Sequence, residues 1–288
     1  MKNRLHRKYV GMILLLTAVA IGGCTERELS ERPADGVLKI NLEWPDGQNV
    51  GGARLWLYGS DGKLYAEIGC AAEGHECRVP ADSYTILAAN SDCSNAECHH
   101  PETWRDCRMA AKQMPDADLL EHVGKVFCTG TDKVTVTWGN RSTEVTLRPE
   151  NVVKKIHFKI DPDYIGDIAG MDVRMAGVVP SVKLMDGSDA GEATGEVVAK
   201  AKSEAEGLYS ADMSVFGWRG ENTVTVTVVH TDGSTEVTVP QDISGQLAQL
   251  PEEGGTVHII LSLPDGGEIA LTVTVKAWES GTGSGTVI

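Results

Sequence analysis

The stretch that decides the fold is TVTVTV, at residues 223–228. Threonine and valine alternate in it, so an extended chain places all the valines on one face and all the threonines on the other. Both residue types are β-branched and favour strands. The stretch therefore predicts a strand of an antiparallel sheet that buries one face and exposes the other to water.

Runs with the same period of two recur on both sides of this stretch. The predicted strands before residue 150 are 38–44, 53–58, 63–68, 84–89, 133–138 and 143–147. Those after it are 154–160, 197–201, 208–215, 222–230, 236–239, 257–263 and 269–278. Asp-Gly pairs, which suit tight turns, end or separate several runs, at 46–47, 61–62, 186–187, 232–233 and 265–266.

This pattern predicts an all-β protein with two tandem antiparallel β-sandwich domains, at residues 37–149 and 150–288. A length of 288 residues is sufficient for two such cores. One segment, residues 110–123, is predicted to form a short helix. No internal repeat of 20–50 residues is visible.

Charge and motifs exclude several classes of function. The chain has 26 Lys and Arg against 41 Asp and Glu, whereas a nucleic-acid-binding protein needs a basic face. Nucleophile elbows, phosphate-binding glycine loops, zinc-protease motifs and EF-hand loops are all missing from the sequence. We therefore expect a protein that is not an enzyme and that has no catalytic residue, metal or cofactor.

The N-terminus predicts export. Residues 1–23 hold four basic residues and no acidic one, and residues 10–21 form an apolar run too short to span a bilayer comfortably. These features are typical of a signal peptide. The following Ile21-Gly22-Gly23-Cys24 resembles a bacterial lipobox, although leucine is commonest where Ile21 stands.

A lipobox predicts cleavage before Cys24, whose sulfur then carries diacylglycerol with acyl chains such as palmitate esterified to its glycerol. Several chains on one residue anchor a protein firmly. Residues 24–36 would be a polar tether, and the protein would lie on the cell outer membrane, exposed at the surface. The alternative is ordinary cleavage near Gly23, which leaves Cys24 as a free thiol.

The six remaining cysteines all lie between residues 70 and 128. They are Cys70, Cys77, Cys93, Cys98, Cys107 and Cys128. An even number suits disulfides in an oxidising compartment, with fifteen connectivities possible. A metal site is the alternative, because His99 and His100 lie within the cluster, but the usual C-x2-C spacing is missing. Free thiols are the third possibility.

The six tryptophans divide into two groups. Trp44, Trp56, Trp138 and Trp278 lie in predicted strands or at their ends, where we expect them to anchor the cores. Trp104 and Trp218 lie in predicted loops, where an exposed indole could offer a platform for a sugar.

Several short segments follow one another in an order that resembles a known family. They are Gly22-Gly23-Cys24 with its acidic tether, 37–44, 54–58, 79–84 leading to 89–90, 147–149, 175–178, 216–217, and 232–233 before 242–244. Together they resemble the fimbrial-anchor-like lipoproteins of Bacteroidales, which are related to the FimB-type anchor. The cysteine cluster departs from that pattern.

The resemblance implies two transthyretin-like domains and a protein that anchors or assembles a fimbria. Its partners would then be fimbrial subunits that dock by strand insertion, since an open sheet edge can accept a partner strand. Residues 269–278, followed by 279–288, are the predicted place for such exchange, unless that strand completes its own sandwich. A glycan- or protein-binding surface lipoprotein is the alternative function, and a hydrolase or redox protein that uses the Cys/His cluster is a third.

Overall fold

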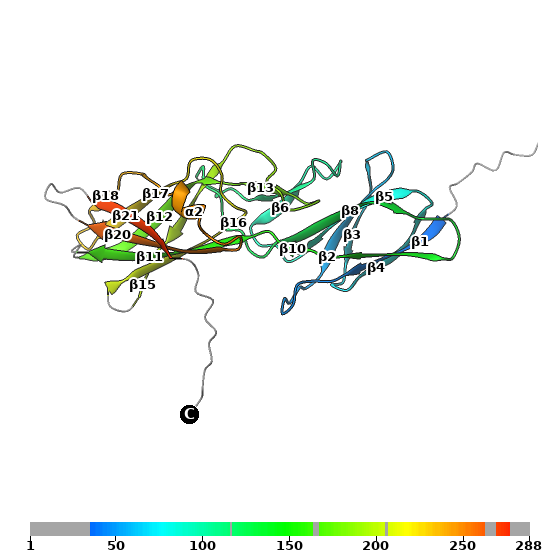
Figure 1. Cartoon of the computed structure of the whole chain (residues 1–288), viewed down its shortest axis with the longest axis horizontal. Coiled ribbons are helices and arrows are strands. Elements are labelled where there is room, and N and C mark those ends of the chain that lie inside the picture. Colours follow the sequence, from blue (N-terminus) through cyan, green and yellow to red (C-terminus); the bar gives the residue numbers. More distant parts are fainter. Residues whose placement is uncertain (1–34, 116, 164–166, 205–206, 263–268, 277–288) are drawn as a thin grey trace, which may run out of the picture.

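The computed structural model describes residues 35–115, 117–163, 167–204, 207–262 and 269–276. The predicted signal peptide, Cys24, most of the tether and Trp278 lie outside these residues. Two halves, residues 35–151 and 152–276, follow one another along the long axis of the molecule (Figure 1). Both are built from strands, which confirms the predicted all-β class. No helix in the described part is long and apolar enough to cross a membrane.

The first half is a sandwich of two sheets, with strand orders β4-β1-β9 and β10-β8-β5-β2-β3. Its strands are β1 (Asp35–Leu42), β2 (Ala53–Tyr58), β3 (Leu64–Cys70), β4 (Gly74–Pro80), β5 (Ser83–Asn90), β8 (Phe127–Thr135), β9 (Ser142–Leu147) and β10 (Glu150–Asn151). Between the sheets lie fully buried side chains that include Leu38, Leu55, Leu57 and Ile86. Because β10 pairs with β8, the sheet of this half extends to residue 151.

The second half is also a sandwich, with strand orders β15-β16-β11-β20-β21 and β14-β12-β17-β18. Its strands are β11 (Lys154–Asp163), β12 (Ile168–Val178), β14 (Gly195–Lys200), β15 (Lys202–Ser203), β16 (Tyr209–Val215), β17 (Thr223–His230), β18 (Thr235–Val237), β19 (Gln241–Asp242), β20 (Gly254–Ser262) and β21 (Ala270–Lys276), and α2 is Ser244–Leu247. The valines of 223–228 are fully buried in β17 and the threonines are half-buried, as the alternation predicts.

The two halves share one strand order, although the sequence shows no repeat. β1 pairs in parallel with β9, and β11 pairs in parallel with β20. The opposite sheets run β3-β2-β5-β8 and β14-β12-β17-β18. The halves differ at one edge: β21 lies antiparallel beside β20, whereas the described residues place no strand on the outer side of β9.

A third sheet joins the halves. It consists of β6 (Ala96–His99), β7 (Arg108–Ala111) and β13 (Ser181–Lys183), in the order β13-β7-β6. The prediction of a helix at 110–123 is wrong. Pro115 interrupts that segment, and the Leu120 N–H donates instead to the Glu196 carbonyl at 2.8 Å. The Glu121 N–H donates to the Lys112 carbonyl at 2.8 Å, so the segment folds back on itself as a tight hairpin whose second arm lies against the second half.

Candidate functional site

The outer edge of β9 is the first candidate site. The Glu43 N–H donates to the Leu147 carbonyl at 3.0 Å, so Leu147 directs its backbone groups toward β1. Consecutive strand residues direct these groups to opposite edges, so Thr146 and Glu144 direct theirs outward. In the second half the corresponding edge of β20 is occupied by β21. The outward backbone groups of β9 are therefore placed to hydrogen-bond to an incoming strand, as those of β20 do to β21.

An exposed tryptophan lies in the loop that leads into this edge. Trp138 is 75% exposed, which contradicts the predicted core role. Its position between β8 and β9 explains the difference, because the core of this half is already filled by residues such as Val136 and Tyr84. Within the strand itself, Val145 of β9 is only half-buried. The edge thus combines free backbone groups with apolar surface, as strand-docking sites do.

The predicted C-terminal exchange strand is paired within its own chain over the residues that the structure describes. β21 pairs with β20 from Thr256↔Lys276 to Ser262↔Ala270. Leu271 and Val273 pack against the core of the second half. In this arrangement the strand completes its own sandwich.

The junction between the halves is the second candidate site. A separate apolar cluster fills it, and its members come from both halves and from the cysteine-rich segment, residues 91–126. They include Trp56, Tyr58, Cys107, Met109, Val123, Val182, Leu184 and Phe216. Trp56 is buried, as predicted. Trp44 is half-buried, and its indole N–H donates to the Ala72 carbonyl at 2.7 Å.

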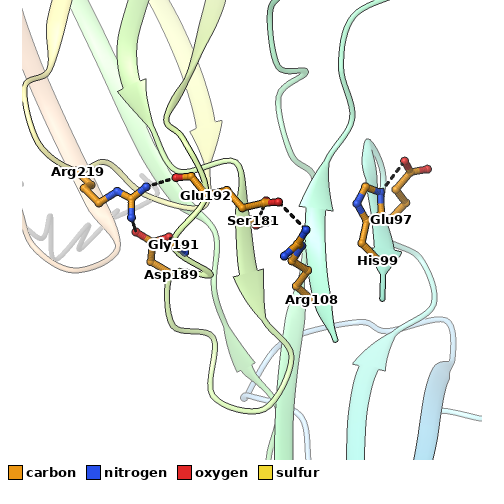
Figure 2. Close-up of polar contacts among 8 residues, drawn as sticks. All are labelled: Glu97, His99, Arg108, Ser181, Asp189, Gly191, Glu192 and Arg219. Atoms are coloured by element: carbon orange, nitrogen blue, oxygen red, sulfur yellow. Dashed lines mark hydrogen bonds and ion pairs between the residues drawn. The ribbon is translucent and has the colours of Figure 1, made fainter. Parts of the chain in front are cut away.

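Polar contacts tie the cysteine-rich segment to the second half (Figure 2). Arg108 of β7 forms an ion pair with Glu192 at 2.6 Å, and the Ser181 hydroxyl donates to the same carboxylate. Arg219 pairs with Asp189 at 2.9 Å and donates to the Glu192 carbonyl. Half-buried pairs that share partners in this way hold a fixed geometry better than isolated surface pairs.

A cleft of about 880 Å³ opens beside the junction. Phe216, Trp218 and Val179 form part of its apolar wall, and Lys154 and Asp186 are among its charged residues. The Lys154 ammonium lies 5.4 Å from the centre of the Trp218 ring. Of the two loop tryptophans, Trp218 thus lines a cleft.

Trp104 is half-buried against the junction cluster, and the Arg105 guanidinium lies 4.6 Å from the centre of its ring. Trp218 is also half-buried and packs against the core of the second half, so the two loop tryptophans differ in that Trp218 lines the cleft and Trp104 does not.

The cysteine-rich cluster forms no metal site among the described residues, where no group of three His, Cys, Asp or Glu is placed to hold an ion. His99 contacts Glu97 at 3.1 Å, and this hydrogen bond lowers the pKa of Glu97. His99 and His100 form an edge-to-face pair with ring centres 6.3 Å apart.

The structure separates the six cysteines into different environments. Cys70 and Cys77 pack at the core of the first half, whereas Cys93, Cys98, Cys107 and Cys128 belong to the junction cluster. All six are thiols in the structure. The predicted disulfides are not formed in it, and their connectivity stays a prediction.

No family model matches the sequence, and no curated protein matches it. Solved structures do. A candidate adhesin from Bacteroides ovatus has a TM-score of 0.65 at 14% identity, covering 77% of this chain and 88% of its own. The fimbrial anchor protein Mfa2 from Porphyromonas gingivalis has a TM-score of 0.59 at 10% identity, covering 84% and 98%.

A candidate polysaccharide-binding protein from Bacteroides thetaiotaomicron has a TM-score of 0.55 at 11% identity, covering 83% of this chain and 97% of its own. The likeness is one of fold. It spans nearly the whole of each neighbour, so it includes both sandwiches and their order.

Proposed function

We propose that this protein is a surface lipoprotein that anchors or assembles a fimbria. Cys24 would carry the lipid that holds it on the outer membrane, and fimbrial subunits would dock by adding a strand to the β9 edge. The fold likeness to the anchor protein Mfa2 and to candidate adhesins supports this role. The open edge of β9 is the observation that carries the proposed docking mechanism.

The pairing of β21 with β20 indicates which strand would fit. In β21, Leu271 and Val273 alternate with Thr272 and Thr274, and the two apolar residues pack against the core. A subunit strand with the same alternation could hydrogen-bond to the outward groups of Thr146 and Glu144 while its apolar residues contact Val145 and Trp138.

Replacing Thr146 by proline tests this mechanism. The substitution removes one outward N–H that has no strand partner in the described structure. We expect the variant to fold and to lose most of its crosslinking to fimbrial subunits on intact cells, measured by mass spectrometry of the crosslinked products. Thr146→Val is the matched control, because it keeps the N–H and the β-branched shape.

Two outcomes contradict the docking mechanism. One is equal recovery of fimbrial subunits with Thr146→Pro and Thr146→Val, when circular dichroism shows that both variants are folded. The other is recovery of glycan-uptake or porin-type partners alone from the wild-type protein. The second outcome would also remove the fimbrial role itself.

Binding of a glycan in the junction cleft is a second candidate function. Its support is the position of Trp218 in the cleft wall, since an indole face beside charged hydrogen-bonding groups is typical of sugar sites. The fold likeness to a candidate polysaccharide-binding protein agrees with it.

Replacing Trp218 by alanine is expected to abolish any glycan signal of the wild-type protein on an array of surface polysaccharides. The loss would follow from removing the stacking platform. Trp104→Ala is the control, because that indole is also half-buried beside a cation but does not line the junction cleft. A wild-type protein that binds no glycan, or a Trp218→Ala variant that binds as well as wild type, would contradict this candidate.

A further inference from the structure

Two of the six thiols contact each other within the junction cluster. The sulfur atoms of Cys98 and Cys107 are 3.6 Å apart. Cys98 lies in β6 opposite Met109, and Cys107 immediately precedes β7. Sulfur atoms in van der Waals contact need only a small movement to reach the bonding distance of about 2.05 Å.

The backbone already holds Cys107 in place. Its N–H donates to the Thr103 carbonyl at 3.0 Å, and its carbonyl accepts from the Leu184 N–H of the second half at 3.1 Å. A covalent bond from Cys107 to Cys98 would therefore connect β6 directly to the residue that the second half holds.

We infer that Cys98 and Cys107 form a disulfide that locks the β6–β7 hairpin into the junction between the two halves. The reaction joins the two sulfur atoms and removes one proton from each thiol, while two electrons pass to a disulfide oxidant of the oxidised-glutathione type. Cys98 attacks one sulfur of the oxidant and releases its first thiol. Cys107 then attacks the Cys98 sulfur and releases the second thiol.

Access to the pair agrees with this order of events. A cavity of about 280 Å³ is lined by Cys98 and also by Arg54, Trp56 and Glu97. Cys98 is half-buried and can be reached through this cavity, whereas Cys107 is fully buried. The oxidant would thus meet Cys98 first, and Cys107 would complete the bond from the inside.

The other four cysteines lack such a partner in the described structure. Cys93 donates to the Asn90 carbonyl at 3.1 Å, and Cys128 contacts the Lys183 carbonyl at 3.9 Å. Burial raises the pKa of Cys93 to about 11 and that of Cys128 to about 12. The hydrogen bond to Cys107 and burial raise the pKa of Cys98 as well, so the contact between sulfur atoms, and not the pKa, distinguishes the pair. Cys70 and Cys77 pack against the core of the first half, apart from the junction cluster.

Peptide mapping of the full-length protein tests the pairing. The protein is incubated with oxidised glutathione, denatured with iodoacetamide present, digested without reductant and analysed by mass spectrometry. We expect one linked species that joins the peptides of Cys98 and Cys107. Cys98→Ser should eliminate this species and leave Cys107 alkylated, whereas Cys93→Ser should leave it unchanged.

A second measurement covers the case in which a variant folds poorly. Dithiothreitol should lower the midpoint of thermal unfolding of the oxidised wild-type protein by several degrees and should leave that of a Cys98→Ser/Cys107→Ser double variant unchanged. Alkylation of both Cys98 and Cys107 in the oxidised wild-type protein would overturn the inference. A link from either residue to any other cysteine would do the same. The pairing is independent of the fimbrial proposal, so each can fail alone.

Discussion

Replacing Leu120 by alanine is expected to destabilise the folded protein by about 2–5 kcal/mol, the usual cost of truncating a buried leucine. Leu120 belongs to the cysteine-rich segment that leaves the first half, yet its side chain lies in the core of the second half, where it is 7% exposed. The packing is tight, because a Cβ built on Gly195 would come within 2.7 Å of the Leu120 Cδ1 atom. Urea unfolding followed by circular dichroism gives the change in free energy.

Leu208→Ala is the matched control, because Leu208 is 40% exposed and its truncation should change the free energy of unfolding by no more than about 0.5 kcal/mol. Equal costs for the two variants would show that Leu120 does not hold the segment on the second half. If the segment does couple the halves, Leu120→Ala should also broaden or split the unfolding transition, because the halves would then unfold less cooperatively.

Local signals in the sequence were sufficient for many of the strands, although no strand was predicted at β4 or at β12. The alternation at 223–228 gave the buried and exposed faces of β17 correctly, because the pleat fixes which face each residue takes. The Asp-Gly pairs were equally informative. Gly47, Gly62, Gly187 and Gly233 all have positive φ, between 70° and 85°, which glycine adopts without strain. Asp265-Gly266 lies outside the described residues.

Contacts between distant segments could not be predicted in this way. β7 pairs with β13 across about seventy residues of chain, and nothing in the sequence of either short strand names its partner. The prediction of a helix at 110–123 is wrong for a related reason: a local hairpin and hydrogen bonds to the second half take the place of helical hydrogen bonds. The position of Trp138 at the end of a predicted strand favours a core role, but the turn after β8 leaves it 75% exposed.

For the candidate site too, the sequence supplied the local features, and the contacts between distant segments came only from the structure. The sequence indicated strand docking only through a family resemblance, and it placed the exchange at the C-terminal strand. The open edge of β9 became recognisable only from the strand order, because the two halves share a topology without sharing a sequence. The cysteine cluster was evident from spacing, whereas the contact between Cys98 and Cys107 required the register of β6 on β7.

Replacing Cys24 by alanine is expected to abolish metabolic labelling of the protein with a palmitate analogue and to release it from the membrane fraction. Lipid attachment at a lipobox requires the cysteine sulfur, and alanine offers no nucleophile. Because a protein held by several acyl chains is firmly anchored and one without them is not, we expect a near-complete shift from membrane to soluble fractions. Labelling followed by fractionation of the cells measures both effects.

Thr25→Ala is the matched control for this experiment, since it changes the neighbouring residue and keeps the Cys24 thiol. Labelling retained by Cys24→Ala would remove the lipid anchor from the proposed function. Labelling lost together with crosslinking to fimbrial subunits would show that docking at the β9 edge requires the protein to be held at the membrane. Lost labelling with unchanged crosslinking would assign the two roles to separate parts of the chain, the lipid to Cys24 and the docking to the sandwich.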